Sequence, residues 1–280
     1  MNLILQGLAT DRSTIDRIAA LADAQRIVQL APNAWRCEGV GCSGELKARI
    51  DSECFAAQLD YAFVAPGRKL ADFKLVTMDM DSTLITIECI DEIADMQGLK
   101  PQVAEITEAA MRGEIEFRES LARRVSLLKG LDAGALQRVY DERLKLSPGA
   151  ENMLNAVKAA GLKTLLVSGG FTFFTDRMKG RLGLDYTHSN ELEIVDGRLT
   201  GKVVGGIVDA DEKKNTVERV CRELGISPQQ AIVMGDGAND LKMMGISGLS
   251  VAFRAKPVVR AQADIALNFV GLDGILPLFD

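Results

Sequence analysis

The chain has 280 residues, 47% of them hydrophobic and 26% charged, so it can bury a sizeable core and has room for roughly two domains. Its formal net charge of −6 argues against non-specific binding to nucleic acid. The start of the chain lacks the basic and apolar stretches of a signal peptide, and no apolar run reaches the length of a membrane span. Five cysteines without a C-x-x-C pair, with a single histidine, argue against a zinc site. We therefore expect a cytoplasmic protein with neither membrane nor nucleic acid as a partner.

Residues 1–68 are expected to form a small module of their own. Their hydrophobic patterns predict strands at 3–6, 26–30, 35–39 and 61–64, with helices at 10–24 and 45–59. The order βαββαβ is that of a ferredoxin-like α+β fold. No catalytic constellation is visible in this stretch, which leaves scaffolding, dimerisation or small-ligand sensing as its expected roles.

An apolar, β-prone run at 73–78 predicts a buried strand, and Asp79-Met80-Asp81-Ser82-Thr83 follows it directly. Ligands of open α/β sheets bind at the carboxyl ends of strands, where a turn can aim both carboxylates into one crevice. Two carboxylates about 4 Å apart repel by roughly 4 kcal/mol at an effective dielectric of about 20, and a hard cation such as Mg²⁺ removes that cost. A simple strand-to-turn corner is the alternative reading of this motif taken alone.

Residues 88–147 are predicted to form an all-helical cap inserted between two strands. Helical periodicity covers 88–98, 101–111, 117–128 and 133–143, with glycines between the segments. The insert would lie over the sheet edge that carries Asp79, where it can close over a substrate and exclude water.

From residue 148 onward, strands and helices alternate again. Helices are predicted at 150–160, 172–182, 212–224 and 241–244, strands at 163–167, 231–234, 249–252 and 263–267, and a hairpin at 192–195 with 199–204. The stretch around His188 is expected to be a loop. Parallel strands joined by helices predict a doubly wound, Rossmann-like α/β core made of 72–87 and 148–280.

Two further predicted strands of the core also end in polar, glycine-containing loops. Ser168-Gly169-Gly170 offers a hydroxyl and open backbone N–H groups near a helix start, which suits a phosphate, although a plain turn is the simpler reading. Asp236 and Asp240 add two carboxylates, which alone could merely cap the next helix. These loops are expected at the same sheet edge as Asp79.

Lys213 and Lys214 begin the helix predicted at 212–224. Surface lysines are the ordinary reading, but a lysine at a helix start opposes the helix dipole, which hints at a compensating anion. Only one of two adjacent lysines is expected to reach that anion.

Together and in this order, these stretches resemble the haloacid dehalogenase-like phosphatases. That family carries D-x-D-x-T after the first strand, Ser or Thr after the second, then a lysine and a G-D-x-x-x-D loop. The matching residues here are Asp79, Asp81, Thr83, Ser168, Lys213, Asp236 and Asp240. The resemblance runs from about residue 73 to the C-terminus.

The resemblance implies a catalytic role for each match. Asp79 would be the nucleophile that forms an aspartyl-phosphate, and Asp81 the general acid and base. Ser168, Gly169 and Lys213 would bind the phosphate. Mg²⁺ would be held by Asp79, Asp236 and the Asp81 backbone, with Asp240 orienting its waters.

The cap narrows the resemblance to phosphoserine phosphatases, through the segments 88–94 and 117–125. In that family the residue matching Glu88 contacts the substrate ammonium and the one matching Arg124 its carboxylate, which agrees with the chemistry of both groups. Phe117 and Met111 would enclose the substrate, and Asn239 would contact it or the phosphate. Without the resemblance, Glu88 and Arg124 would be ordinary helix-surface charges.

The implied reaction is hydrolysis of O-phospho-L-serine, the last step of serine biosynthesis. Residues 1–68 resemble ACT-like domains in architecture, so a homodimer through this module is a further expectation. Two other functions remain open at this point. One is a phosphatase or phosphotransferase for another small phosphorylated metabolite, such as transfer to homoserine, and the other is an amino-acid sensor with a vestigial phosphatase core.

Overall fold

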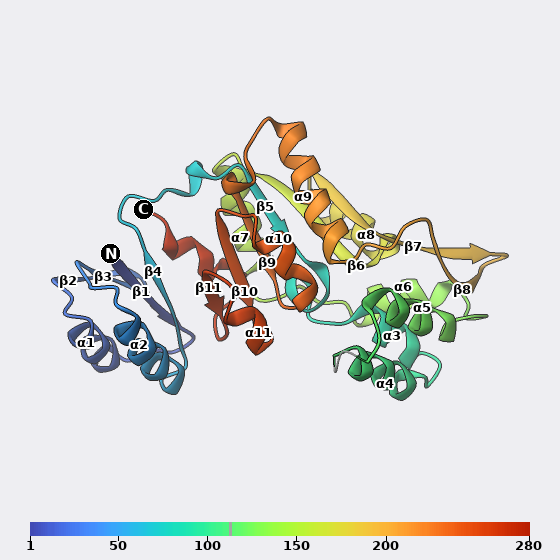
Figure 1. Ribbon diagram of the computed structural model, residues 1–280, viewed down its shortest axis with the longest axis horizontal. Helices are drawn as coiled ribbons and strands as arrows, with labels where there is room; N and C mark the ends of the chain where they lie inside the picture. Colours follow the sequence, from blue (N-terminus) through green and yellow to red (C-terminus); the bar gives the residue numbers. More distant parts are fainter. Residues whose placement is uncertain (112–113) are drawn as a thin grey trace.

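The computed structural model describes residues 1–111 and 114–280, without the side chain of Met111. Figure 1 shows a small module with its own sheet at one end, an α/β core in the middle and the helices α3 to α6 at the other end. Both chain termini lie on the side of the small module. The division of the chain into 1–68, 72–87 with 148–280, and 88–147 stays our interpretation of these parts.

The small module is an antiparallel sheet covered on one face by two helices. It contains β1 (Asn2–Gly7), α1 (Arg12–Leu21), β2 (Arg26–Ala31), β3 (Ala34–Glu38), α2 (Gly44–Ala56) and β4 (Leu59–Val64). The strand order β2-β3-β1-β4 is the one expected for a ferredoxin-like βαββαβ unit. Leu3 and Leu5 of the sheet pack with Ile15 and Ile18 of α1 and with Ile50 of α2.

Helix α1 is shorter than the predicted 10–24. The Asp11 carboxylate accepts the N–H groups of Ser13 and Thr14, so the helix begins at Arg12. At the other end Asp23 has a φ of 51°, a conformation through which a right-handed helix cannot continue.

The core is a seven-stranded sheet with β5 (Leu75–Met78) near its centre. The others are β6 (Lys163–Phe171), β7 (Tyr186–Val195), β8 (Arg198–Val204), β9 (Ala231–Gly235), β10 (Leu249–Phe253) and β11 (Ile265–Leu267). Their order is β11-β10-β9-β5-β6-β7-β8, parallel throughout except for the β7–β8 pair. The chain passes from β5 to β6 on one side and later to β9 on the other. The predicted doubly wound α/β fold is confirmed.

Helices cover both faces of the core sheet. Val76 and Met78 of β5 pack with α7 (Ala150–Ala159) and α8 (Thr172–Leu182). Leu75 points to the opposite face and packs with α9 (Ala210–Leu224) and α10 (Leu241–Met244). A further core helix is α11 (Pro257–Arg260). A strand that is buried on both faces has a continuous apolar sequence, which is why the apolar run at 73–78 predicts β5 well.

The cap consists of α3 (Cys89–Asp95), α4 (Lys100–Met111), α5 (Phe117–Leu127) and α6 (Gly134–Glu142). Its two connections to the core run side by side. Ile85 and Leu146 form an antiparallel bridge, and the Ser147 N–H donates to the Leu84 carbonyl at 2.9 Å.

The β7–β8 hairpin supports the cap at a second place. The Gly130 N–H donates to the Leu199 carbonyl at 2.8 Å, and the Leu199 N–H donates to the Leu131 carbonyl at 2.9 Å. Figure 1 shows the hairpin reaching out from the sheet beside α5 and α6. The end of α5 and the start of α6 are therefore bound to the core by main-chain hydrogen bonds.

Two polar stretches whose composition predicts loops lie in strands instead. The stretch around His188 forms the first half of β7, because His188 pairs with Val167 of β6. Ser168, Gly169 and Gly170 continue β6, although the pairing with β7 shifts register there. Around His188, main-chain pairing with β6 overrides the preference of polar residues for turns. Residues 168–170 form an irregular stretch between the paired positions Val167 and Phe171.

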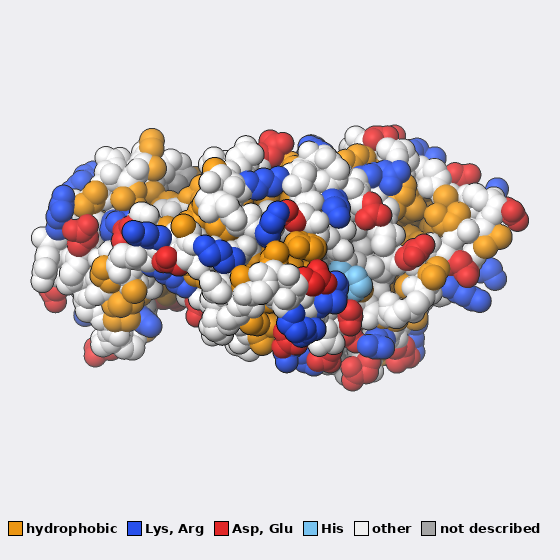
Figure 2. All heavy atoms as spheres, turned by 90° about the horizontal axis from the view of Figure 1, so that it is seen from above, with side chains coloured by type: hydrophobic (Ala, Val, Ile, Leu, Met, Phe, Trp, Pro, Cys, Tyr) orange, Lys and Arg blue, Asp and Glu red, His pale blue; other side chains and the backbone are white. Residues whose placement is uncertain are grey.

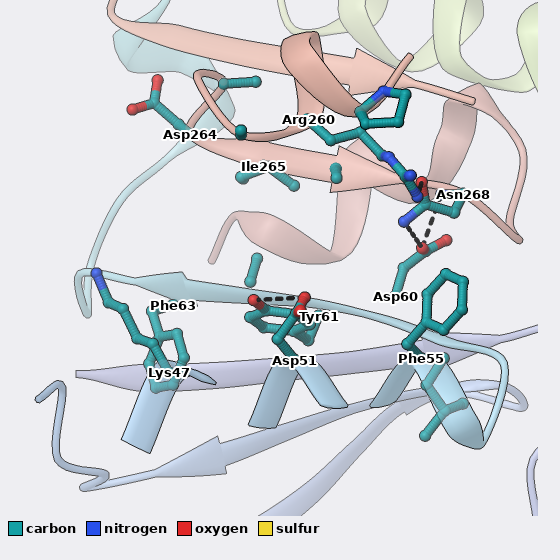
Figure 3. A pocket seen from close by; sticks show the side chains of 16 residues that line it. Lys47, Asp51, Phe55, Asp60, Tyr61, Phe63, Arg260, Asp264, Ile265 and Asn268 are labelled. Atoms are coloured by element: carbon teal, nitrogen blue, oxygen red, sulfur yellow. Dashed lines mark hydrogen bonds between the residues drawn. The ribbon is translucent and has the colours of Figure 1, made fainter. Parts of the chain in front are cut away.

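Asp60 is one of the residues that hold the small module on the core. Its carboxylate, only 1% exposed, accepts the backbone N–H groups of Asn268, Phe269 and Val270 at 2.7–3.0 Å. Figure 3 shows Asp60 and Asn268 at the edge of a cavity of about 540 Å³ between the module and the core. The C-terminal turn η5 (Leu272–Leu278) adds a second contact, because Gln6 of β1 donates to the Gly274 carbonyl.

Acidic and basic side chains are interspersed over the face of the molecule seen in Figure 2. Among the described residues, no helix is long and apolar enough to cross a membrane.

Candidate active site

The carboxyl ends of β5, β6 and β9 meet at the centre of the core sheet. Asp79 is the first residue after β5, and its N–H still pairs with β9 at 3.0 Å. The chain then makes a tight turn, η2 (Met80–Leu84), in which Ser82 has a φ of 55°. This turn brings the Thr83 hydroxyl within 3.4 Å of the Asp236 carboxylate, to which it donates. The first and last loops of the predicted site are therefore in direct contact.

Lys213 joins two of the aspartates. Its ammonium donates to Asp79 Oδ1 at 2.8 Å and to Asp240 Oδ1 at 2.7 Å, and the whole side chain is buried. Residues far apart in the sequence thus meet in one buried network. A charged group out of water is stable only with partners of this kind.

Helix α9 distinguishes the two adjacent lysines. The Asp209 carboxylate caps the helix and so fixes which residues of its first turn face the sheet. Lys213 points into the site, whereas Lys214 is partly exposed and pairs with Glu218 of the same helix at 3.7 Å. The geometry favours Lys213 as the lysine that serves the site.

The buried carboxylates make proton binding easier for one another. Burial raises the pKa of Asp79 well above its usual range, against the opposing effect of the Lys213 ammonium. Burial and the neighbouring Asp240 carboxylate raise the pKa of Asp236 to about 6. Burial acts in the opposite sense on Lys213, but Asp240 and Asp79 outweigh it and raise the pKa of that ammonium. Lys213 is therefore charged at neutral pH.

The carboxylates of Asp79, Asp236 and Asp240 converge, with one oxygen of each within 4.8 Å of the others. Acidic oxygens at this spacing fit a hard divalent cation such as Mg²⁺. If all three carboxylates are ionised, Lys213 neutralises one of the three negative charges, and a divalent ion would balance the other two. The donor set therefore suits the predicted metal.

Asp240 supports the other two aspartates. Its Oδ1 accepts Lys213 and its Oδ2 accepts the Gly237 N–H at 3.1 Å, so both oxygens already have a donor. It reaches this place because residue 235 is glycine: a Cβ there would lie 2.3 Å from Asp240 Oδ2. Asp79 and Asp236 keep more of their oxygens available for a metal ion.

Asp81 faces the first turn of the cap. Its Oδ1 accepts the backbone N–H of Cys89, the first residue of α3, at 3.0 Å. Its Oδ2 lies so close to β6 that a Cβ at Gly170 would approach it to 2.6 Å. Burial raises the pKa of Asp81. A carboxyl group that holds its proton in this way can serve as a general acid.

Ser168 and Gly169 lie at the end of β6. Ser168 is completely buried, and its hydroxyl accepts the Gly170 N–H at 2.8 Å. Gly169 lies under the cap, where a Cβ would come within 3.2 Å of the Phe117 ring of α5. Phe117 therefore lies over the sheet edge.

Asn190 holds this strand end in place, and sequence reasoning missed it. Its amide donates to the Gly169 carbonyl at 2.7 Å and accepts the Val208 N–H at 2.8 Å. It thereby ties β6 to the segment that leads into α9. The available signal was an asparagine that is buried in a strand, but this is visible only once residues 186–190 are known to belong to β7.

Glu88 and Arg124 bring opposite charges to the cap side of the site. Glu88 accepts the Ser82 hydroxyl at 2.6 Å, and burial together with the Asp81 carboxylate raises its pKa to about 7. Arg124 is partly buried, which lowers its pKa, and it forms no ion pair with a described residue. Its Nε lies 3.4 Å from the Ser120 carbonyl. A partly buried guanidinium that forms no ion pair with a described residue is suited to bind the carboxylate of a ligand.

Two further residues predicted to contact the substrate lie in the turn after β9 and at the end of α4. Asn239 lies in the turn η4 (Ala238–Asp240) after β9, beside Gly237, where a Cβ would lie 2.2 Å from the asparagine oxygen. Met111 ends α4, but its side chain lies outside the described residues.

Comparison with known proteins places these features in a family. Residues 73–248 match the family model of the haloacid dehalogenase-like hydrolases, and residues 3–46 match a domain of unknown function, DUF4072. The first match includes the entire cap and every strand end that contributes to the site.

A phosphoserine phosphatase from Polaromonas sp. is 60% identical over 218 residues, which is 76% of this chain and 92% of that protein. A haloacid dehalogenase family hydrolase from Salmonella enterica serovar Typhi aligns with 100% of this chain and 98% of its own, with a TM-score of 0.88 and 33% identity. A phosphoserine phosphatase solved as a phospho-aspartyl intermediate analogue covers 74% of this chain and 99% of its own, with a TM-score of 0.70 and 38% identity. The Salmonella structure shares the small module as well as the core and cap.

Proposed function

This chain belongs to the haloacid dehalogenase-like hydrolases, and we propose that it hydrolyses O-phospho-L-serine to L-serine and phosphate. The assignment of the substrate rests mainly on Arg124. This residue, on the cap side of the site, is a partly buried guanidinium with no ion-pair partner among the described residues. Glu88 offers the opposite charge nearby. An amino-acid substrate has an ammonium and a carboxylate that satisfy both groups.

Asp79 is the nucleophile in this proposal. Its Oδ1 is held by Lys213, while Oδ2 has no donor within the described part of the chain. Oδ2 attacks phosphorus to form an aspartyl-phosphate, and the bond from phosphorus to the serine oxygen breaks. The phospho-aspartyl analogue of the solved phosphoserine phosphatase supports this step.

Asp81 moves the proton. It donates its proton to the departing serine oxygen, and the resulting carboxylate then takes a proton from the water that hydrolyses the acyl phosphate. The raised pKa of Asp81 suits the first step, because the free site holds this carboxyl protonated more readily than an exposed aspartate.

Lys213, Ser168 and the Gly169 N–H are proposed to bind the phosphoryl group, where fixed positive charge and donors stabilise the transition state. Mg²⁺ would be held by Asp79, Asp236 and the Asp81 backbone carbonyl, with Asp240 orienting its waters. When bound, the ion neutralises the charge of the phosphoryl oxygens.

The cap side is proposed to recognise the amino acid. Glu88 would bind the ammonium, Arg124 the carboxylate, and Phe117 with Met111 would close over the substrate. Asn239 would contact the substrate or the phosphate from the β9 loop. In the cell this reaction would be the last step of serine biosynthesis in the cytoplasm, and a homodimer through residues 1–68 stays a prediction.

A substrate panel tests the proposal. Phosphate release from L-phosphoserine is compared with release from p-nitrophenyl phosphate, in wild type, Arg124→Ala and Arg123→Ala. Arg123 is the matched control, because it is exposed and pairs with Glu119 of its own helix. We expect Arg124→Ala to lose about 10- to 100-fold in kcat/KM for phosphoserine only, since hydrogen bonds to charged groups contribute about 1.5–3 kcal/mol.

Hydrolysis of the generic ester but not of phosphoserine would refute the roles of Glu88 and Arg124 and keep the phosphatase chemistry. Transfer of the phosphate to added homoserine in place of water would point to the phosphotransferase instead.

A further inference from the structure

The cap is attached along one edge by main-chain hydrogen bonds. The paired connections at Ile85 and Leu146 and the hairpin bonds of Leu199 lie on this edge, and the Ala133 N–H adds a bond to the Gly197 carbonyl at 2.8 Å. This edge cannot leave the core without breaking several backbone bonds together.

The opposite edge, formed by the first turn of α5, is held by side chains. Nε and Nη2 of Arg118 both lie 2.6 Å from Asp209 Oδ2. The described residues contain one ion pair between the cap and the core, and it is this one. Phe117, the preceding residue, lies over Gly169, so the ion pair is directly beside the proposed substrate pocket.

Asp209 connects this ion pair to the catalytic lysine. Its Oδ1 accepts the Glu212 N–H at 3.0 Å, and its carbonyl accepts the Lys213 N–H at 2.9 Å. The residue that binds Arg118 therefore also begins the helix that positions Lys213. Asp209 thus contacts both the cap, through Arg118, and the helix that positions the proposed phosphate-binding lysine.

The exposure of the pair suits a contact that forms and breaks. The Arg118 side chain is 63% exposed and that of Asp209 is 15% exposed. Breaking the pair returns both charges to water, so it lacks the penalty of a buried ion pair.

We propose that Arg118 is a positioning residue whose ion pair with Asp209, here called the cap latch, closes the free edge of the cap over bound substrate. The cap then opens by rotation about the edge that the β7–β8 hairpin holds. The expected effect of the latch on KM rests on the proposed function, whereas its expected effect on hydrogen exchange in the cap does not.

The latch is tested with Arg118→Ala, Asp209→Asn and the double variant. Asparagine retains the helix cap of α9 and removes the charge. We expect KM for phosphoserine to rise about two- to fivefold in each single variant without a fall in kcat, because exposed pairs contribute little. The double variant should show no further increase, and Arg118→Lys should restore part of the affinity. Added salt should raise the KM of wild type by a larger factor than the KM of the variants, because only wild type also has the latch to lose.

Hydrogen exchange of the free protein provides a measurement that needs no substrate. We expect Arg118→Ala to exchange faster at 114–121, the latched edge, and unchanged at 129–136, the edge bound by the hairpin. Arg123→Ala, on the next turn of α5, should behave as wild type in both experiments.

Equal effects in Arg123→Ala, additive effects in the double variant, or equally faster exchange at both edges would overturn the latch. If wild type hydrolysed no phosphoserine, the proposed function would fail, and hydrogen exchange would still decide whether the latch holds the cap.

Discussion

At the scale of single residues, the site depends on a buried lysine between two carboxylates. Lys213 is bonded to Asp79 and Asp240, and all three side chains are buried. Removing one member of a buried ion network typically costs about 3–5 kcal/mol, because the remaining charges lose their partner. The same lysine is therefore needed for stability and, in the proposed mechanism, for phosphate binding.

Lys213→Met should abolish measurable turnover and lower the free energy of unfolding by about 3 kcal/mol. Lys214→Met, the matched control one residue away, should change both by little, because its pair with Glu218 is exposed. Steady-state kinetics and urea unfolding measure the two effects. Comparable losses in Lys214→Met would show that the wrong lysine has been assigned.

Glu88 predicts a pH dependence of substrate binding. Burial and Asp81 raise its pKa to about 7, so below that pH the group is protonated and cannot pair with an ammonium. We expect kcat/KM for phosphoserine to rise as the pH rises through about 7 and then to level off. Glu88→Gln should remove this limb.

The control for this pH profile is p-nitrophenyl phosphate. It has a phosphate that ionises near pH 6 but no ammonium, so the difference between the two substrates isolates Glu88. An identical limb for both substrates would exclude Glu88 as its origin.

Much of the site can be predicted from the sequence, because its residues stand directly after apolar runs. Asp79 and Asp236 follow buried strands, and the fold brings strand ends together whatever the details of the helices. Asn190 could not be predicted, because its role depends on a strand pairing that the polar residues around it do not reveal. The preference for Lys213 over Lys214 depended on a family pattern, since both are equally polar in sequence.

At the scale of elements, capping and pairing explain where prediction and structure differ. Asp11 shortens α1 at its start by capping it, and the pairing of β7 with β6 makes a strand of residues around His188. Elements with strong periodicity, such as α9, agree to within a few residues. Boundaries depend on single side chains, which hydrophobic periodicity does not register.

The contact between β4 and the loop after β11 depends on one carboxylate, so Asp60→Ala should lower the free energy of unfolding by about 3 kcal/mol. The change leaves three backbone N–H groups without their acceptor. Asp51→Ala is the matched control, because Asp51 is exposed and accepts the Tyr61 hydroxyl, a bond drawn in Figure 3, without bonding to a core residue among those described. Urea unfolding measures both, and equal stabilities would show that Asp60 does not hold the module.

At the scale of the whole molecule, metal binding is predicted to stabilise the fold. Mg²⁺ at about 100 times its dissociation constant should add about 2.7 kcal/mol, seen as a higher Tm, because the ion binds the folded cluster only. Asp236→Asn should lose this increase, and EDTA should abolish turnover. Asp211→Asn, an exposed aspartate paired with Lys242, should keep it. A Tm that does not respond to Mg²⁺ would contradict the metal site.

The most direct test of the proposed mechanism is to trap the covalent intermediate. Enzyme mixed with phosphoserine that carries radioactive phosphorus, together with Mg²⁺, is quenched in acid, and the phosphate bound to protein is measured. Hydroxylamine then releases this phosphate and leaves a hydroxamate label on the modified aspartate, which peptide mapping locates. We expect the hydroxamate label on Asp79 in wild type and none in Asp79→Asn, which should also lack turnover. Turnover of phosphoserine by Asp79→Asn, or label on a different residue, would contradict the proposed mechanism.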